Sequence, residues 1–591
     1  MNPWLCNLLF NNSGGSSLPV TGQTFYASLK TSLVPEVGMG GPTWSRATAA
    51  WRLNDIGYLR QIQSGCAEFG GARLVVNLAP RSEVINAGWT LSGVTASDAN
   101  TLLESAGGTT HQIGTSITTL GTYLLEVWMK RGTGSTRHVR LEVSSSDLAR
   151  VNFNLDTGEI ASIAQSGALS LISYGADASV DAGGYRRFYI RVNISASASN
   201  TFYPARLTEG LNGTISYSGD GTSSILIGKV KISDVTGRDA SYVPEYVSVG
   251  VLSAPYHGAG TDGCKYFSTD WQGAPIPVAN LTRLRKEPAA TNIVLRNRLF
   301  HPTVNGVSTL GERWVCSQST GSELINNGDF ATDSVWVKGM GWTIGSGVAT
   351  ATLVDDHQLN QNLGALIQAG KTYVLTYTQT RTAGYLTPSL GSTASNCGQP
   401  RNSSGTFTAT LVCGTSDARL YFYPWGSFSG TLDNVSLKQC AIQIETATGL
   451  DGIANTATTL TALGSDVIIL QPTSGIASAA RCASAYVRRK MGTGTISFTQ
   501  DGGSTWTDIT SLINTSTYYR VQITATLANP SVGFKISTSG DAIEVDCVQN
   551  EAGSVASSPI VTTTATVARN TDALTYQTAS NWADAAGTAY L

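Results

Sequence analysis

The chain has 591 residues, which at about 150 residues per domain corresponds to roughly four domains. Charged residues make up only 13%, about half of the usual quarter, and the formal net charge is −2. The chain therefore has no basic excess to neutralise a nucleic-acid backbone, and it lacks the high charge of disordered proteins. Hydrophobic residues, at 41%, are numerous enough to form cores. The remainder, rich in Ser, Thr, Gly and Asn, is typical of an all-β protein.

The first 73 residues contain one apolar patch, at 4–10. It is shorter than the ~20 residues that span a bilayer. No basic residue precedes it and no small-residue cleavage pattern follows it, so it does not have the form of a signal peptide. We interpret the patch as a buried N-terminal strand or a docking segment, and we expect no membrane insertion. The nine cysteines include no Cys-x-x-Cys pair, which argues against a structural zinc site.

Strand-like alternation of apolar and polar residues recurs along the chain, at 138–143, 185–194, 419–423 and 519–524. Clusters of Gly, Asn, Asp and Pro separate these segments, and no long stretch shows the period of an amphipathic helix. Many short strands with frequent turn signals predict β-sandwiches or barrels. The expected fold class is all-β, with several jelly-roll or β-sandwich modules in tandem.

Two distant regions repeat each other. Residues 126–134 and 485–494 both read as a strand, a basic pair and a Gly-Thr-Gly turn. The strands at 184–192 and 517–524 also match, and the closing strands at 227–234 and 543–551 match loosely. The two regions are therefore interpreted as copies of one sandwich. The first copy is predicted to be module 1, residues 74–245, and a connector follows at 246–290.

A different module lies between the copies. Its opening reads Leu-Ile-Asn-Asn-Gly-Asp-Phe at 324–330, and its closing reads Leu-Asp-Asn-Val-Ser-Leu at 432–437. We predict a sandwich, module 2, at 322–438. The second copy lacks its opening strand directly upstream of residue 450, whereas an Asn-led strand and a Trp occur at 292–295 and 314.

This arrangement predicts that module 2 is inserted in module 3, which would comprise 291–321 and 439–553. Insertion into a surface loop has a small entropic cost, since each doubling of loop length costs only ~0.6 kcal/mol. The alternative is three modules in series, with 291–321 as a linker. Residues 554–591 are expected to be a C-terminal linker or the start of a further strand or domain, because 587–591 resembles the first half of a strand.

Two motifs with catalytic associations are interpreted as turns. Residues 499–506 fit the Asp box of sialidase propellers, but only one copy occurs. Asp501 can accept hydrogen bonds from turn amides, and Trp506 can cover the turn. The Asp-Thr-Gly at 156–158 lacks the second carboxylate that an aspartic protease needs.

The opening and closing sequences of module 2 resemble the two ends of a carbohydrate-binding-module jelly roll. The 485–551 stretch is similar to modules repeated in bacteriophage tail fibres, spikes and head fibres. Segments at 45–48, 54–57, 67–71, 246–252 and 289–292 also resemble these proteins. The resemblance implies a virion structural protein in a fibre or spike, located on the tail or capsid surface and assembled in the host cytoplasm. It further implies a homotrimer, bound to other virion proteins through its N-terminal segment, that attaches to the host surface.

Candidate site residues follow from module 2. If Leu420 and Phe422 face the core, Tyr421 and Tyr423 point outward, and Trp425 follows in a predicted Pro-Trp-Gly turn. The alternatives are that these outward rings stack on a host glycan or that they pack against a neighbouring subunit or domain. The jelly-roll resemblance also implies a structural calcium ion near Asp329 and Asp433. The alternative is that these are ordinary strand-end carboxylates. No other cofactor is expected.

No catalytic residues are predicted. The five histidines are isolated, and no metalloprotease, nucleophile-elbow or P-loop motif occurs. Two alternatives to a fibre or spike remain open. One is a tailspike-type or secreted polysaccharide hydrolase with accessory sugar-binding modules, which would need about 250 residues for a catalytic domain of barrel size. The other is a capsid-decorating fibre without a receptor role.

Overall fold

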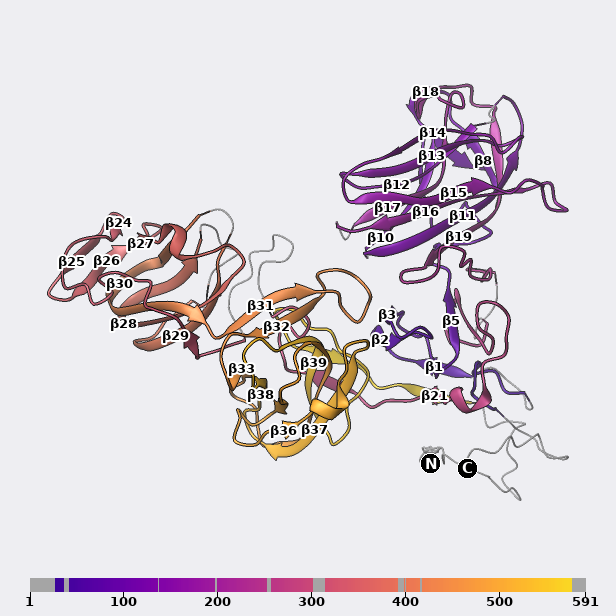
Figure 1. Ribbon diagram of the computed structural model, residues 1–591. Helices are drawn as coiled ribbons and strands as arrows, with labels where there is room; N and C mark the ends of the chain where they lie inside the picture. Colours follow the sequence, from indigo (N-terminus) through magenta and orange to yellow (C-terminus); the bar gives the residue numbers. More distant parts are fainter. Residues whose placement is uncertain are drawn as a thin grey trace, which may run out of the picture. The chain divides into compact units, whose positions relative to one another are not determined.

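The computed structural model is all-β, as the sequence predicts (Figure 1). It describes residues 27–36, 42–118, 120–135, 138–196, 199–251, 257–300, 314–391, 398, 400–414 and 417–576. The apolar patch at 4–10 and the C-terminal residues 577–591 therefore lie outside the described residues. Contacts divide the chain into two units. One ends at Pro288 and resumes at Asn570, and the other is Ala289–Arg569. Within the described residues, no helix is long and apolar enough to cross a membrane.

Module 1 is a sandwich of two six-stranded antiparallel sheets. One sheet has the order β14-β13-β12-β17-β10-β6 (Ile160–Gln165, Leu148–Asn154, His138–Ser144, Asn200–Leu207, Gln112–Ile117, Thr90–Ser92). The other has the order β15-β16-β11-β19-β8-β7 (Leu169–Ala176, Arg186–Ile194, Gly121–Arg131, Ser224–Asp234, Thr101–Glu104, Val94–Ala96). A small pair, β9 (Gly107–Thr110) and β18 (Ser216–Gly219), lies beside them.

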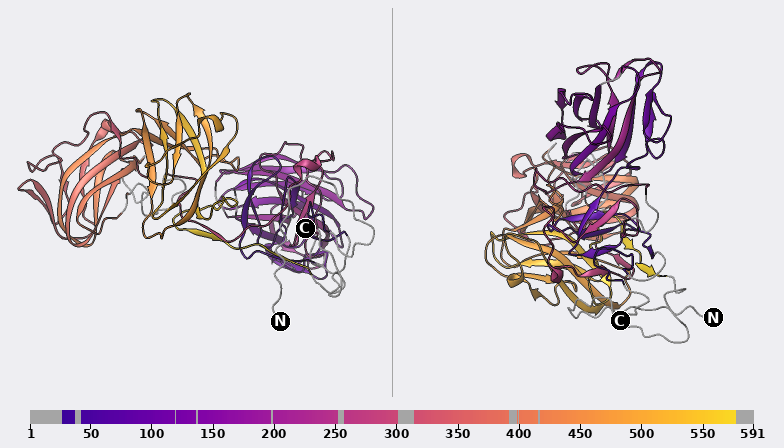
Figure 2. Two further views of the ribbon diagram at one scale, coloured as in Figure 1. Left: turned by 90° about the horizontal axis from the view of Figure 1, so that it is seen from below. Right: turned by 90° about the vertical axis from the view of Figure 1, so that its right-hand side faces the viewer.

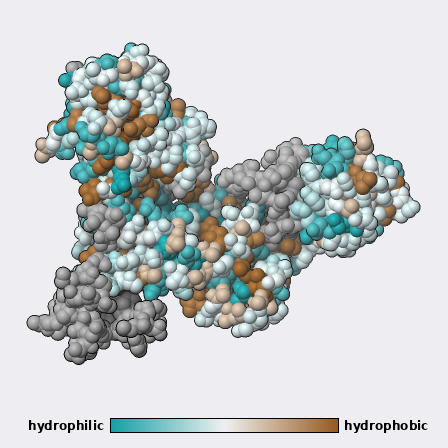
Figure 3. Space-filling view, turned by 180° about the vertical axis from the view of Figure 1, so that it is seen from behind, coloured by the Kyte–Doolittle hydropathy of each residue, from teal (hydrophilic) through white to brown (hydrophobic). Residues whose placement is uncertain are grey.

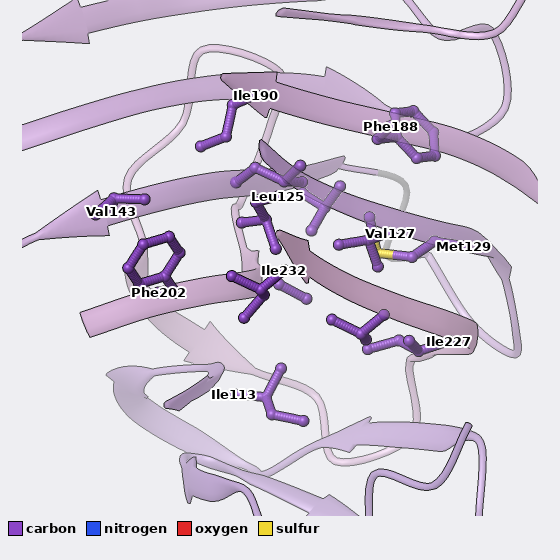
Figure 4. Close-up of a cluster of buried hydrophobic side chains, with 14 of the residues drawn as sticks. Ile113, Leu125, Val127, Met129, Val143, Phe188, Ile190, Phe202, Ile227 and Ile232 are labelled. Atoms are coloured by element: carbon purple, nitrogen blue, oxygen red, sulfur yellow. The ribbon is translucent and has the colours of Figure 1, made fainter. Parts of the chain in front are cut away.

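The core of module 1 forms because alternate residues of both sheets point inward. Figure 4 shows Leu125, Val127 and Met129 of β11 in one apolar cluster with Phe202 of β17. All four side chains are buried.

Module 3 contains a five-stranded and a four-stranded sheet. The first has the order β31-β32-β39-β34-β37 (Ile442–Ala447, Ala457–Ala462, Ala542–Ala552, Ala479–Met491, Tyr519–Leu527). The second has the order β33-β38-β35-β36 (Val467–Pro472, Ser531–Ile536, Ile496–Thr499, Thr507–Asp508), with the short 3₁₀ helix η4 at Thr510–Leu512. In module 1, β11 lies between β16 and β19; in module 3, β34 lies between β37 and β39. These are the strands that the sequence repeat matches.

A buried asparagine makes the same set of contacts in both copies. Asn77 donates from Nδ2 to two carbonyl oxygens, those of Val230 at 3.1 Å and Val247 at 2.9 Å. Its Oδ1 accepts hydrogen bonds from the amides of Ala79 at 3.1 Å and Ile232 at 3.0 Å.

In module 3, Asn292 donates from Nδ2 to the carbonyl oxygens of Val548 at 3.1 Å and Ile560 at 3.0 Å. Its Oδ1 accepts from the amides of Val294 and Asn550, each at 3.1 Å. Asn292 therefore opens this sandwich as Asn77 opens the first, although about 250 residues separate it from the strand that it contacts.

The core of module 3 draws on both sides of module 2. Trp314 and Cys316 belong to the same apolar cluster as Val487 and Val545. The Val315 backbone bridges to Leu470, with N–O distances of 2.7 and 2.9 Å. Residues 314–316 therefore lie in the core of module 3 although module 2 follows them in sequence, and residues 310–313 lie outside the described range.

Module 2 has one continuous network of paired strands that wraps around its own core. Two strands are long enough to serve both layers, namely β28 (Thr372–Leu390) and β30 (Arg419–Cys440). The others are β23, β24, β25, β26, β27 and β29 (Ser319–Thr320, Val337–Lys338, Trp342–Gly345, Val348–Val354, Leu359–Asn362, Gly405–Val412), and η2 lies at Gly364–Leu366. Figure 2 shows this module and its neighbour from two further sides.

The segments flanking module 1 form a small β region. Its strand pairs are β1–β41, β2–β3, β4–β21 and β5–β20 (Thr43–Ser45, Ala573–Thr575, Ala50–Leu53, Leu59–Ile62, Glu68–Gly70, Arg283–Arg285, Arg73–Val76, Cys264–Phe267), and η1 lies at Val278–Asn280. A pair within the other unit, β22–β40 (Ala290–Asn292, Val567–Arg569), adjoins it in sequence. From the sequence, the N-terminal segment, the connector and the C-terminal segment are predicted as separate parts. In the structure, residues of all three segments belong to one apolar core. Pairings of three or four residues between such distant segments leave no local sequence pattern.

Candidate functional site: an aromatic surface on module 2

The aromatic run at 421–425 lies on the outer face of a sheet. Leu420 and Phe422 are fully buried, whereas Tyr421 and Tyr423 are half-buried and point to the other side. The cause is the two-residue period of β30, which sends successive side chains to opposite faces. The predicted turn at 424–426 is wrong, because β30 continues through it to Cys440. Positive φ angles at Gly426 and Ser427, 63° and 54°, bend the strand without reversing it.

The two tyrosine rings stack on each other. Their centroids are 5.4 Å apart, with an interplanar angle of 26°. The Tyr421 hydroxyl donates a hydrogen bond to the Asp417 carboxylate, and burial together with this carboxylate raises the pKa of Tyr421. A sugar ring therefore has no space between the two tyrosines, and only their outer faces are available for stacking.

The neighbouring strand adds an aromatic residue that the sequence did not single out. Tyr385 of β28 is the direct cross-strand partner of Trp425. Trp425 is 39% exposed and Tyr385 38%. Directly opposed side chains in antiparallel strands have Cβ atoms about 4.5–5.5 Å apart. We call Tyr385, Tyr421, Tyr423 and Trp425 the aromatic surface.

Polar groups border the aromatic surface. Arg419 Nη1 donates to Asn360 Oδ1 at 3.0 Å, and its Nε lies 3.7 Å from Asp417 Oδ1. Thr387, the cross-strand partner of Tyr423, is 3% exposed, and its hydroxyl has no hydrogen-bond partner among the described residues. Charged and polar side chains therefore lie next to the aromatic rings.

The predicted calcium residues lie where the opening and closing segments of module 2 meet. The Val435 amide donates to the Gly328 carbonyl at 2.8 Å, which brings the segments of Asp329 and Asp433 together. Both Asp433 oxygens accept hydrogen bonds from Asn434, at 2.6 and 2.9 Å. Among the described residues, no three His, Cys, Asp or Glu side chains gather as a metal site. Calcium takes about 6–8 oxygen ligands, so most would have to be backbone or amide oxygens. The calcium site stays a prediction.

Both motifs interpreted as turns form turns. Asp501 Oδ1 accepts from the Thr505 amide at 3.0 Å and from the Thr499 hydroxyl at 2.8 Å. Gly503 has φ +89°, and a Cβ there would lie 2.8 Å from the Trp506 ring. In the Asp-Thr-Gly segment, the Gly158 amide closes the hairpin onto the Asn154 carbonyl at 2.9 Å.

No protein-family model matches the chain, and the search of curated proteins finds no match. Among solved structures, 43 chains match. One is the tandem CBM22 pair of Xyn10C from Paenibacillus barcinonensis, with 8% identity, 41% of this chain and 100% of that chain covered, and a TM-score of 0.17. Another is the tandem CBM51 modules of a family 98 glycoside hydrolase from Streptococcus pneumoniae, with 9% identity, 43% and 96% coverage, and a TM-score of 0.15.

A third match is Sulfolobus Turreted Icosahedral Virus, with 8% identity, 79% and 91% coverage, and a TM-score of 0.12. The structural neighbours of this all-β chain therefore include tandem carbohydrate-binding modules and, at a greater distance, a virus structure.

Proposed function

We propose that this protein is a structural component of a bacteriophage fibre or spike and attaches the particle to the host surface. The sequence segments similar to phage fibre proteins support the particle type. The modular sandwiches support the role, because such modules present sheet faces and loops on stable scaffolds.

The aromatic surface is the observation that supports a role in attachment to the host surface. Tyr385 and Trp425 are large apolar rings, both more than one third exposed and directly opposed on neighbouring strands. Aromatic rings combine a large apolar face with few rotatable bonds, which suits them to stacking on the apolar faces of sugars. On the face seen in Figure 3, apolar residues occur in small groups among hydrophilic ones. A contact of this size binds weakly, and many copies on one particle can raise avidity by roughly 10²–10⁴.

A glycan array with the full chain tests this role. The Trp425→Ala and Tyr385→Ala proteins are compared with wild type, and Tyr519→Ala in module 3 serves as the control because Tyr519 is similarly exposed, at 47%. We expect at least a tenfold loss of glycan binding in the first two variants and none in the control. Equal glycan binding by all four proteins, or no binding to host-surface glycans by wild type, would contradict the proposal.

The proposed function needs no catalysis. The pure protein is incubated with host capsular or lipopolysaccharide glycans, and new reducing ends are measured. We expect none. Steady release at catalytic protein concentrations would favour the polysaccharide hydrolase instead.

The proposal includes self-association and a virion location. We propose a homotrimer that docks on other virion proteins through residues 1–73, with no nucleic-acid partner and no membrane insertion. Light scattering of the purified chain measures the oligomer, and a monomer at every concentration would contradict the trimer. Pull-down of virion proteins with and without residues 1–73 tests the docking segment.

A further inference from the structure

Four buried cysteines form two pairs, and each pair brackets a sandwich. Cys66 and Cys264 flank module 1, whose core cluster extends from Ala79 to Ile232. Cys316 and Cys440 flank module 2 in the same way. All four side chains are at most 1% exposed. The chain thus enters and leaves each of these sandwiches beside a pair of thiols.

The first pair lies in the small β region at the base of module 1. Cys264 begins β20 and pairs in register with Val76, the last residue of the strand that leads into module 1. Cys66 lies in the same core, and the amide that follows it, that of Ala67, donates to the Ala259 carbonyl at 2.8 Å. The two thiols lie within hydrogen-bonding reach of each other.

The second pair lies where module 2 joins module 3. Cys440, the last residue of β30, pairs in register with Ser319. The next amide, that of Ala441, donates to the Gln318 carbonyl at 2.9 Å, and Cys316 Sγ lies 3.5 Å from that same carbonyl oxygen. Both cysteines belong to the core of module 3, and their thiols are also within hydrogen-bonding reach.

The surroundings of the first pair favour a thiolate. The hydrogen bond with Cys264 lowers the pKa of Cys66, and the guanidiniums of Arg46 and Arg52 lower it further against the effect of burial. Arg52 is held in place by Nη1, which donates to the Tyr266 hydroxyl at 2.8 Å. A lowered thiol pKa increases the fraction of thiolate, which is the form that attacks an oxidant.

We propose that each pair is a latent disulfide, which closes under oxidising conditions and ties together the two chain segments at the base of its sandwich. A peroxide is a sufficient oxidant. The Cys66 thiolate attacks one peroxide oxygen and the O–O bond breaks. Cys66 becomes a sulfenic acid, and hydroxide is the leaving group. The Cys264 sulfur then attacks the sulfenyl sulfur. The S–O bond breaks, and the departing hydroxide takes up the thiol proton as water.

The same two steps join Cys316 to Cys440. Each bond formed transfers two electrons to one peroxide. This inference concerns the chain's own thiols and does not depend on host attachment.

Peptide mapping of the full chain tests the proposal. The protein is purified with a reductant, treated with hydrogen peroxide, alkylated under denaturing conditions and digested without reduction. We expect cross-linked peptides joining Cys66 to Cys264 and Cys316 to Cys440, each lighter by two hydrogens and separated by dithiothreitol. If all four cysteines remain open to alkylation, or if cross-links join them to other cysteines, the proposal is wrong.

Thermal unfolding tests the consequence. Each bond closes a loop of more than about 100 residues, so oxidation should raise Tm by roughly 5–10 °C. Cys264→Ser and Cys440→Ser should each lose one cross-link and part of this rise. Cys482→Ser, which changes an equally buried thiol of β34, should keep both cross-links. If a variant fails to fold, peptide mapping of the wild-type chain still decides. Cross-links without any rise in Tm would refute the proposal that the disulfides tie together the chain segments at the base of each sandwich.

Discussion

Replacing Asn292 by Ala should destabilise module 3 selectively, although this residue lies far in sequence from most of that module. The side chain is fully buried and makes four hydrogen bonds to backbone groups of three chain segments. A hydrogen bond contributes about 1 kcal/mol, and buried groups left without partners cost more. We therefore expect a loss of about 2–4 kcal/mol in the free energy of unfolding. Asn77→Ala should cost module 1 a similar amount, because the contacts are equivalent.

Hydrogen exchange followed by mass spectrometry assigns each loss to its module. Asn292→Ala should accelerate exchange in β34 and β39 and leave β11 and β19 unchanged, whereas Asn77→Ala should do the reverse. Asn212→Ala, at an exposed site in module 1, is the control. Wild-type protection of β34 and β39 in Asn292→Ala would refute the reasoning and would favour three modules in series.

Three further changes test individual contacts by chemical denaturation. Trp314→Ala removes a buried ring stacked on Phe300, with centroids 3.7 Å apart, and should cost about 3–5 kcal/mol; a loss below 1 kcal/mol would place Trp314 outside the core. Burial raises the pKa of Glu551 in the folded protein. The stabilisation that this group adds to the free energy of unfolding is therefore complete below the unfolded pKa of about 4.3, and it is lost as the pH rises through the folded pKa. Glu551→Gln should therefore be more stable than wild type near neutral pH and equal to it in acid; lower stability at neutral pH would contradict this. Hydrogen bonds from Thr505 and Thr499 outweigh burial and lower the pKa of Asp501, so its contribution is present above about pH 4 and is lost in acid. Asp501→Asn should weaken the 499–506 turn at neutral pH, and an unchanged free energy of unfolding there would contradict the turn interpretation.

Local pattern was enough to predict much of the fold. The alternation at 419–423 correctly placed Leu420 and Phe422 in the core and Tyr421 outside it, because strand period alone fixes the face. The repeat between 126–134 and 485–494 correctly identified the central strands of two similar sheets, since equivalent positions carry equivalent packing.

Features that depend on register or on distant pairing could not be read from the sequence. Tyr385 joins the aromatic surface only because β28 and β30 align it with Trp425. Register shifts in this pairing prevent the alignment from being found by counting residues along the two strands. The two thiol pairs join residues more than 100 positions apart, so spacing gave no signal. The turn predicted at 424–426 failed because positive φ angles at Gly426 and Ser427 were enough to bend β30 without ending it.

Immunogold labelling of intact particles tests the proposed function most directly. Antibodies raised against the purified chain are applied to particles from the host that produces it. We predict gold on fibres or spikes at the particle surface, with labelling reduced when excess purified chain competes. Unlabelled particles together with abundant chain in the particle-free fraction would contradict a virion structural role.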